Sequence, residues 1–333
     1  MHFWLLLRPD IRRPIGGVKQ MHRLAESLIA NGVSATIIQD DKNFHPGWFN
    51  SSVPTIAYPD WLRLVQSSVL DRDTNFLVIP ETYIPQLQNL AKLLPIIVFN
   101  QNASYTFGLP SSGSFVKPRG VIDLYRSPLV CHVVCVPRHD YRFLSSVLGS
   151  ESHGKLSLVV NAIDVDQCSF LPKKKIISYM PRKNSLDSSV VCALLQTQPW
   201  FTDWKLVAIS NMNHSDVLRL LGQSLAFLSF GHPEGFGLPV AESLACGCSV
   251  IGYSGLGGRE LFEQTQDSSV CNEVPVGDWQ GFVDAVYSYI FKFNEDTSRI
   301  LRLQTDLSRL TKLSYSQSMM DRSVGNFLKS FCR

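Results

Sequence analysis

Short apolar runs alternate with helical patterns along the whole chain, and this alternation constrains the fold more than any other feature. Residues 3–7 form an apolar run, and the Pro-Ile-Gly-Gly sequence of residues 14–17 predicts a turn. Apolar residues then recur at helical spacing from Val18 to Ile29, until Asn31 and Gly32 end the helix. Runs that are apolar on both faces and separated by helices are typical of a parallel sheet covered on both sides. The pattern predicts further strands at residues 34–39, 75–79, 95–100 and 129–136.

The second half of the chain repeats this alternation. We expect Ser215 to cap a helix there, and Gly247 to end another. Near residues 156–166, the apolar strand 158–160 ends in turn residues 161–164, and a basic run follows at 172–175. This pattern predicts the connection between two domains. The length of 333 residues suits two open α/β domains in tandem. The predicted elements of this half are strands at 176–180, 205–210, 225–230 and 249–253 and helices at 189–196 and 239–246.

Composition excludes several classes of protein. With 45% hydrophobic and 18% charged residues the chain is an ordinary globular protein rather than a disordered one. The net charge of +3 is too small to imply nucleic-acid binding. The eight cysteines have no zinc-ligand spacing, so we expect buried thiols and no metal.

The first residues carry a basic cluster: Arg8, Arg12, Arg13, Lys19 and Arg23. Such a face suits an anionic acceptor or lipid headgroups, and a solvated surface explains it equally well. The charges also follow residues 1–7 too closely for a secretory signal. No run approaches the ~18 apolar residues of a membrane helix. We therefore expect a cytoplasmic protein, with peripheral membrane contact through its first domain as a further option.

Residues 230–247 are the most informative segment for chemistry. A strand ends at Phe230, and a glycine-containing loop leads into a helix whose first turn is marked by Pro239. Glycines let backbone N–H groups approach a ligand, and a helix N-terminus favours a negative charge such as a diphosphate. Glu234 in the loop and Glu242 in the helix suit sugar or ribose hydroxyls as hydrogen-bond acceptors. The alternative is that both glutamates only complement the helix dipole or a turn.

This Glu-x7-Glu segment, with Ala245–Ile251 behind it, resembles the donor-site signature of the retaining glycosyltransferases of family 4 (group 1), which have the GT-B fold. The resemblance continues in order along the chain, at Gly16-Gly17, at residues 161–164 and at residues 257–261. It implies two Rossmann-like domains that face each other across a cleft. We expect an acceptor-side domain at 1–165, a donor-binding domain at 166–313 and a helix at 314–333 that crosses back to the first domain.

The resemblance assigns roles residue by residue. Glu234 is expected to bind hydroxyls of the donor sugar, and Glu242 the ribose. The Arg and Lys that neutralise the leaving diphosphate map to Arg182 and Lys183, although Asp187 stands where the Lys is usual. Glu234, Arg182 and Lys183 are thus the expected catalytic residues. Backbone groups are expected to line the sugar and phosphates at Gly16, Gly17, Gly235, Phe236, Gly237 and Leu238.

The implied reaction moves a hexose from a nucleotide-diphosphate sugar to a glycan, lipid-linked or small-molecule acceptor, with retention of configuration. Polysaccharide biosynthesis is the corresponding process. Departure of the nucleoside diphosphate leaves an oxocarbenium-like sugar, so the enzyme mainly stabilises developing phosphate charge. Neither a carboxylate nucleophile nor a metal is implied.

Acceptor-side residues follow from the rule that open α/β sheets bind ligands at the carboxyl ends of their strands. Glu81 follows one predicted strand, Asn102 the next, and Arg138 the strand after that. Members of the family often carry a His near the position of Asn102, and this chain has none there. The alternative for each of the three is a loop residue that only forms hydrogen bonds within the protein.

Two other functions keep the same fold. One is a nucleotide-sugar epimerase-like isomerase, which needs acid and base groups that are not evident in this sequence. The other is a catalytically dead module that binds the nucleotide sugar. A dehydrogenase is disfavoured because Gly-x-Gly-x-x-Gly is absent.

Overall fold

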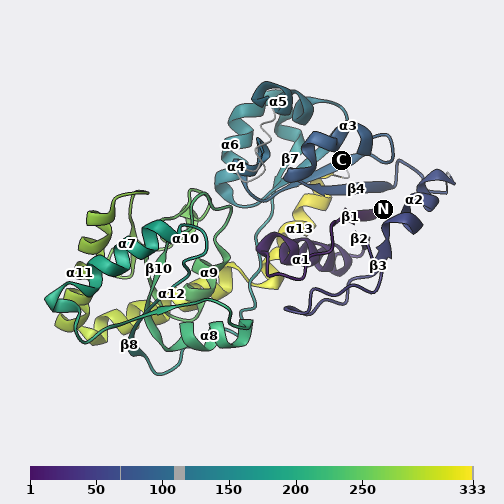
Figure 1. The fold of residues 1–333 in the computed structure, drawn as a ribbon. Coiled ribbons are helices and arrows are strands. Elements are labelled where there is room, and N and C mark those ends of the chain that lie inside the picture. The colour runs from purple at the N-terminus through teal and green to yellow at the C-terminus, as the bar shows by residue number, and fades with distance from the viewer. Residues whose placement is uncertain (68, 109–116, 332–333) are drawn as a thin grey trace. The chain divides into compact units, whose positions relative to one another are not determined.

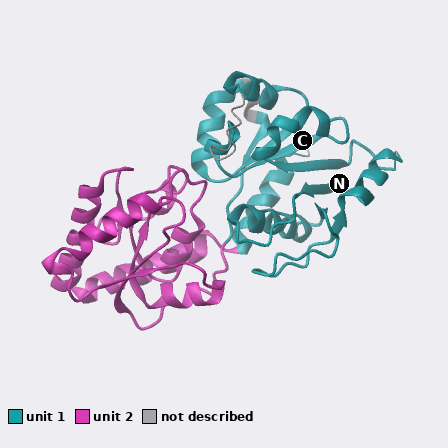
Figure 2. Cartoon of the chain, in the orientation of Figure 1, with its two compact units in different colours: residues 1–162, 317–333 teal, residues 163–316 magenta. Residues whose placement is uncertain are grey.

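The computed structural model describes residues 1–333 except 68, 109–116 and 332–333. The chain forms two compact units (Figure 2). Unit 1 comprises Met1–Ala162 together with Gln317–Arg333, and unit 2 comprises Ile163–Ser316. The chain therefore crosses from one unit to the other twice.

Unit 1 contains a seven-stranded sheet in which every paired strand is parallel, in the order β3-β2-β1-β4-β5-β6-β7. The predicted strands are all present, and β3 adds a short edge strand that the pattern did not predict. The bounds are β1 His2–Leu6, β2 Ser34–Gln39, β3 Thr55–Ala57, β4 Asn75–Pro80, β5 Ile96–Asn100, β6 Val130–Cys135 and β7 Leu156–Leu158.

Both faces of this sheet are buried, as the doubly apolar runs predict. Successive side chains of a strand point to opposite faces. Accordingly Phe3 and Leu5 belong to one hydrophobic core, and Trp4 and Leu6 to the other. The covering elements are α1 Gly16–Ala30, α2 Tyr58–Gln66, the 3-10 helix η1 Glu81–Gln86, α3 Leu87–Leu90, α4 Ala103–Thr106, α5 Pro118–Arg126, α6 Arg138–Leu148, the 3-10 helix η3 Ser150–Lys155 and α13 Gln317–Phe331.

The last helix, α13, packs on unit 1 beside α1 (Figure 1), as expected for a helix that crosses back. Its buried residues Met320, Val324, Phe327 and Leu328 have helical spacing and join the core around Phe3. Polar contacts fix the same helix pair. The Ser27 hydroxyl of α1 donates to Asp321 Oδ1 at 2.6 Å and accepts from Gln317 Nε2 at 2.9 Å.

Unit 2 contains a five-stranded parallel sheet in the order β12-β11-β10-β8-β9. With unit 1 it completes the predicted pair of Rossmann-like parallel-sheet domains. The strands are β8 Lys174–Tyr179, β9 Lys205–Ala208, β10 Ser224–Ser229, β11 Ser249–Gly252 and β12 Cys271–Glu273. The helices are α7 Ser185–Gln196, the 3-10 helix η4 Pro199–Phe201, α8 His214–Gln223, α9 Leu238–Ala245, α10 Arg259–Phe262, α11 Trp279–Glu295 and α12 Thr297–Ser314.

Two local predictions are wrong. Gly16 and Gly17 do not form a turn, because they are the first two residues of α1, which begins after Ile15. Ser215 is not a helix cap, because Asn213 takes that place: its side chain accepts a hydrogen bond from Asp216 N at 2.9 Å, and Ser215 donates to it. In both cases the sequence allows several neighbouring positions for one helix start.

Among the cysteines of the described residues, six are buried and Cys131 is half-buried, while Cys332 lies outside the described residues. The helices in the described part of the chain are all too short or too polar to cross a bilayer.

The packing of α13 on unit 1 is testable through Phe327. Its ring lies 5.1 Å from that of His132 and 5.5 Å from that of Phe331, between ring centroids. We expect Phe327→Ala to lower the free energy of unfolding by about 3–5 kcal/mol, because a buried aromatic side chain is replaced by a cavity. Urea denaturation measures this. Asn326→Ala, at an exposed site on the same helix, should change stability by less than about 0.5 kcal/mol. Equal stabilities of the two variants would contradict the packing.

Candidate functional site

The loop of residues 230–237 connects the carboxyl end of β10 to α9, and it carries Glu234. Gly237 immediately precedes α9 in the left-handed conformation, at φ 84°. A side chain at this position would be strained, so the glycine allows the loop to enter the helix at this angle. Pro239 lies in the first turn of α9, as predicted.

A second loop, residues 254–258, holds the backbone of Glu234 from both sides. Glu234 N donates to Gly255 O at 2.9 Å, and Gly257 N donates to Glu234 O at 3.2 Å. The two segments approach so closely that a Cβ at Gly257 would lie 1.5 Å from Gly235 O. The glycines of residues 257–258 therefore serve close backbone packing against the Glu234 loop.

A third loop, between β8 and α7, contacts the same segment through side chains. Asn184 Nδ2 donates to Phe230 O at 2.6 Å and to His232 O at 3.2 Å. Lys183 Nζ donates to Pro233 O at 2.9 Å and forms an ion pair with Glu234 Oε2 at 2.7 Å. Lys183 and Glu234, both expected as site residues, are thus neighbours.

The sequence also points to Arg182 in this loop and to Asp187 in the first turn of α7. Arg182 is exposed and directly precedes Lys183. Asp187 accepts a hydrogen bond from Trp279 Nε1 at 3.2 Å, which ties the first turn of α7 to α11. The position at which the family usually has a Lys is therefore used here for a contact between two helices.

Glu242 lies on α9 and is only 8% exposed. Its Oε1 lies 3.0 Å from Nε2 of His214, the first residue of α8. The sequence prediction missed His214. The signal available was its position after β9, because polar residues that follow parallel strands collect at one edge of the sheet.

Phe236 is buried beneath the loop. The side chain is 4% exposed, and its ring packs against that of Tyr315 with centroids 4.9 Å apart. Tyr315 in turn donates its hydroxyl to Glu260 Oε1 at 3.1 Å. Leu238, the first residue of α9, is half-buried.

In unit 1, Glu81 and Gly17 are connected through Gln101. Glu81 follows β4 and is 4% exposed, and its Oε2 accepts Gln101 N at 3.1 Å. Gln101 Nε2 donates to Gly17 O at 3.4 Å, and a Cβ at Gly17 would lie 3.4 Å from Gln101 Oε1. A side chain at Gly17 would thus press on Gln101, whereas its φ is not positive and the backbone carries no strain.

Burial raises the pKa of Glu81 from its ordinary value of 4.5 to about 8. The nearby Asp140 carboxyl adds to this rise, while the hydrogen bond from Gln101 N opposes it. Burial also raises the pKa of Asp140. Two carboxyl groups whose pKa values are raised by burial therefore lie near the carboxyl ends of β4 and β6.

Asn100 connects this region to the rest of unit 1. Its Nδ2 donates to Asp140 Oδ2 at 3.0 Å, and its Oδ1 accepts from Tyr125 OH at 2.7 Å. Asn102 is buried and caps α4, with its Oδ1 accepting Ser104 N at 3.0 Å. Arg138 is exposed at the start of α6.

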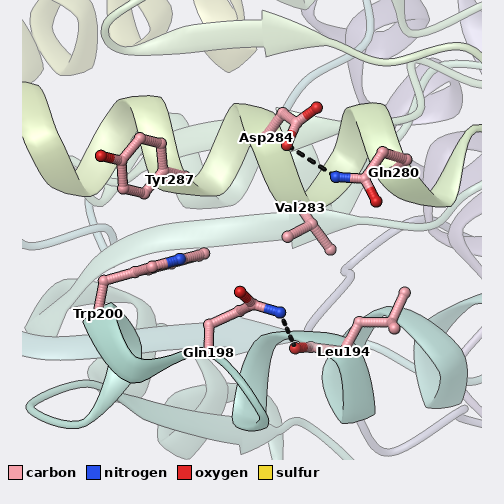
Figure 3. A pocket seen from close by; sticks show the side chains of 7 residues that line it. All are labelled: Leu194, Gln198, Trp200, Gln280, Val283, Asp284 and Tyr287. Carbon is pink, nitrogen blue, oxygen red and sulfur yellow. Dashed lines mark hydrogen bonds between the residues drawn. The ribbon is translucent and has the colours of Figure 1, made fainter.

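Cavities lie away from these loops as well. One of about 290 Å³ opens between α7 and α11 (Figure 3). It is lined by Leu194, Gln198, Trp200, Gln280, Val283, Asp284 and Tyr287. Its polar side chains bond locally, since Gln280 Nε2 donates to Asp284 at 2.9 Å and Gln198 Nε2 to Leu194 O at 3.2 Å. None of these residues belongs to the Glu234 loop, so we do not assign the cavity to the candidate site.

The arrangement around β10 can bind a ligand that carries both hydroxyls and negative charge. Glu234 and Glu242 supply acceptors for hydroxyls. Lys183, Arg182 and the N-terminus of α9 supply positive electrostatic potential.

The raised pKa of Glu81 predicts a specific dependence of stability on pH. Between pH 4.5 and 8 the unfolded chain has lost this proton and the folded chain keeps it, so the free energy of unfolding falls as pH rises. We expect wild type to lose stability relative to Glu81→Gln by about 1.4 kcal/mol per pH unit in this window. Chemical denaturation of both proteins at pH 5, 6, 7 and 8 measures the difference. Parallel pH profiles would show that Glu81 ionises normally in the fold.

Comparisons with known proteins agree with these features. Residues 205–291 match the family model described as "Glycosyl transferases group 1". An α-1,6-glucosyltransferase of Actinobacillus pleuropneumoniae serotype 7 is 35% identical over 75 residues, which cover 22% of this chain and 21% of that protein. The aligned segment thus spans about a fifth of this curated relative.

Solved structures resemble the chain over its whole length. The sucrose-phosphate synthase of Thermosynechococcus elongatus superposes with a TM-score of 0.71 at 12% identity, covering 99% of each chain. A variant of S. aureus TarM, solved with fondaparinux, α-GlcNAc-glycerol and UDP, gives a TM-score of 0.71 at 8% identity over 100% of each chain. At these identities the likeness concerns the fold. The chain therefore has the GT-B fold, and its residues 205–291 are similar to the group 1 glycosyltransferases.

Proposed function

We propose that this protein is a retaining glycosyltransferase that moves a sugar from a nucleoside-diphosphate sugar to a hydroxyl of a glycan, lipid-linked or small-molecule acceptor. The observation that carries the proposal is the position of Glu234 and Glu242 at the carboxyl end of β10, beside Lys183 and the N-terminus of α9. The family match covers both glutamates.

The donor is proposed to bind unit 2. Glu242 accepts hydrogen bonds from the ribose, and Glu234 from hydroxyls of the sugar. The diphosphate lies at the N-terminus of α9, where backbone N–H groups from Gly235 to Leu238 donate to it. Lys183 and Arg182 supply positive charge, with the guanidinium of Arg182 suited to bidentate contact with a phosphate. The UDP named for the TarM structure supports this class of donor.

Unit 1 is proposed to serve the acceptor. Glu81, Asn102 and Arg138 follow adjacent strands at the carboxyl edge of its sheet, where ligands of open α/β sheets bind. The N–H groups of Gly16 and Gly17 begin α1, a position that suits a phosphate oxygen. Within the basic cluster, Lys19 is buried, and Arg8 and Arg23 form ion pairs with Asp40 and Glu26. The exposed Arg12 and Arg13 are suited to an anionic acceptor or to peripheral contact with a membrane.

The reaction then proceeds by charge stabilisation. The bond between the anomeric carbon and the phosphate oxygen breaks, and the electron pair leaves with the nucleoside diphosphate. The acceptor hydroxyl attacks from the same face and gives its proton to the departing phosphate, so configuration is retained. Fixed positive groups stabilise the phosphate charge that develops in the transition state.

We expect Glu242→Gln and Glu234→Gln to impair transfer by different routes. Glu242→Gln should mainly raise the donor KM, because a contact with the ribose persists from ground state to transition state. Glu234→Gln should mainly lower kcat, because its contact with the sugar strengthens as the glycosidic bond breaks. Steady-state kinetics with the identified donor separate the two effects.

Glu263→Gln is the matched control, because Glu263 is an exposed glutamate of unit 2 beyond the loops described. Its kinetics should equal those of wild type. Wild-type kinetics in both Glu234→Gln and Glu242→Gln would refute the assignment of the donor site.

We also expect transfer without a divalent metal. Lys183, Arg182 and the N-terminus of α9 provide the positive charge that a metal supplies elsewhere. Transfer rates measured in EDTA should equal those measured in Mg²⁺ or Mn²⁺. A rate that falls in EDTA and recovers when either ion is added in excess would contradict this.

A further inference from the structure

We propose that His214 is a positioning residue that orients the Glu242 carboxylate for the ribose of the donor nucleotide, and thereby sets the selectivity for a hydroxylated ribose. The proposal deepens the proposed function and rests on it, because it takes Glu242 as the ribose contact. His214 itself is not proposed to touch the sugar that is transferred.

The contact joins two helices that begin at the same edge of the unit 2 sheet. His214 is the first residue of α8, which follows β9, and Glu242 lies on α9, which follows β10. The Nε2–Oε1 distance is 3.0 Å. Of the two side chains, His214 is 24% exposed and Glu242 10%, so the bond is largely shielded from water. An ionised carboxylate can only accept, so His214 donates through Nε2.

The backbone around His214 is itself fixed. The preceding residue, Asn213, caps α8 by accepting Asp216 N at 2.9 Å, and its Nδ2 donates to Asp216 Oδ2 at 2.7 Å. The helix start that carries His214 is therefore held independently of the bond to Glu242. This separation lets one variant remove the bond and another disturb the helix start.

A fixed carboxylate binds a diol better than a mobile one. A glutamate side chain has several rotatable bonds, and holding it in one rotamer costs conformational entropy at the moment of binding. The bond from His214 restricts Glu242 before the nucleotide arrives. The benefit therefore appears only with a ligand whose ribose hydroxyls bond to Glu242.

The experiment measures nucleotide affinity by calorimetry on the full chain. UDP, ADP and GDP are titrated into wild type, and the tightest is then compared with its 2′,3′-dideoxy analogue. We expect His214→Ala to weaken binding of the ribonucleotide by about tenfold, the scale of one hydrogen bond to a charged group. Binding of the dideoxy analogue should change by less than about twofold, because the hydroxyls that use Glu242 are absent.

Two control variants distinguish positioning from a general structural role. His214→Gln keeps an N–H donor at similar reach and should restore most of the ribonucleotide affinity. Asn213→Ala removes the cap of α8 and keeps the imidazole, so it should lower stability with little effect on the preference for ribose. In turnover, His214→Ala should raise the donor KM more than it lowers kcat.

Three outcomes would overturn the inference: equal weakening of ribonucleotide and dideoxy analogue, no weakening of either, or failure of His214→Gln to restore affinity in a folded protein. Glu242→Gln distinguishes failure of the inference from failure of the proposed function. If Glu242→Gln also leaves the preference for ribose intact, the role proposed for Glu242 fails. If Glu242→Gln abolishes the preference and His214→Ala does not, only the role of His214 fails.

Discussion

The backbone of Glu234 is bonded on both sides to the loop of residues 254–258, and the candidate donor site depends on this contact. Gly255 O accepts its N–H, and Gly257 N donates to its carbonyl. Each segment follows a neighbouring strand of one parallel sheet, β10 and β11, so the sheet brings the loops together and the glycines let them touch. The position of the Glu234 carboxylate is therefore set by backbone geometry, which a side chain at Gly257 would destroy.

Side-chain contacts from the other neighbouring strand complete this arrangement. Asn184 and Lys183 follow β8 and bond to carbonyls of the same loop, and Lys183 also pairs with Glu234. From the start of α8, His214 contacts Glu242 of α9. Both carboxylates thus have a cationic or donor side chain beside them. Because these side chains are already held in place, they can bind the hydroxyls and phosphate of a ligand without first rearranging.

The carboxyl edge of the unit 1 sheet carries different chemical groups from that of unit 2. Glu81 and Asp140 are buried near the ends of β4 and β6, and burial raises the pKa of both. Their bonds to Gln101 and Asn100 stabilise the turns that follow the strands. Burial disfavours the ionised forms of these two carboxyl groups, whereas Glu234 of unit 2 is partly exposed and pairs with Lys183.

Sequence patterns predicted the fold well, because the periods of helices and strands and the burial of both sheet faces are local properties. Helix starts were less predictable: Gly16 and Gly17 begin α1 instead of forming a turn, and Asn213 rather than Ser215 caps α8. The contacts within the candidate site were not predictable. His214 and Glu242 are 28 residues apart, and only the pairing order of the strands brings them together. The catalytic and binding roles of the predicted site residues remain predictions.

The most direct measurement is a crystal structure with the nucleoside diphosphate that binds most tightly. We expect a ribose hydroxyl oxygen about 2.6–3.2 Å from the Glu242 carboxylate, and the terminal phosphate at the N-terminus of α9 beside Lys183. A nucleotide bound with its ribose away from Glu242, or at a place that leaves the α9 N-terminus and Lys183 without contact to phosphate, would contradict the assignment of the donor site to the ends of β8, β9 and β10.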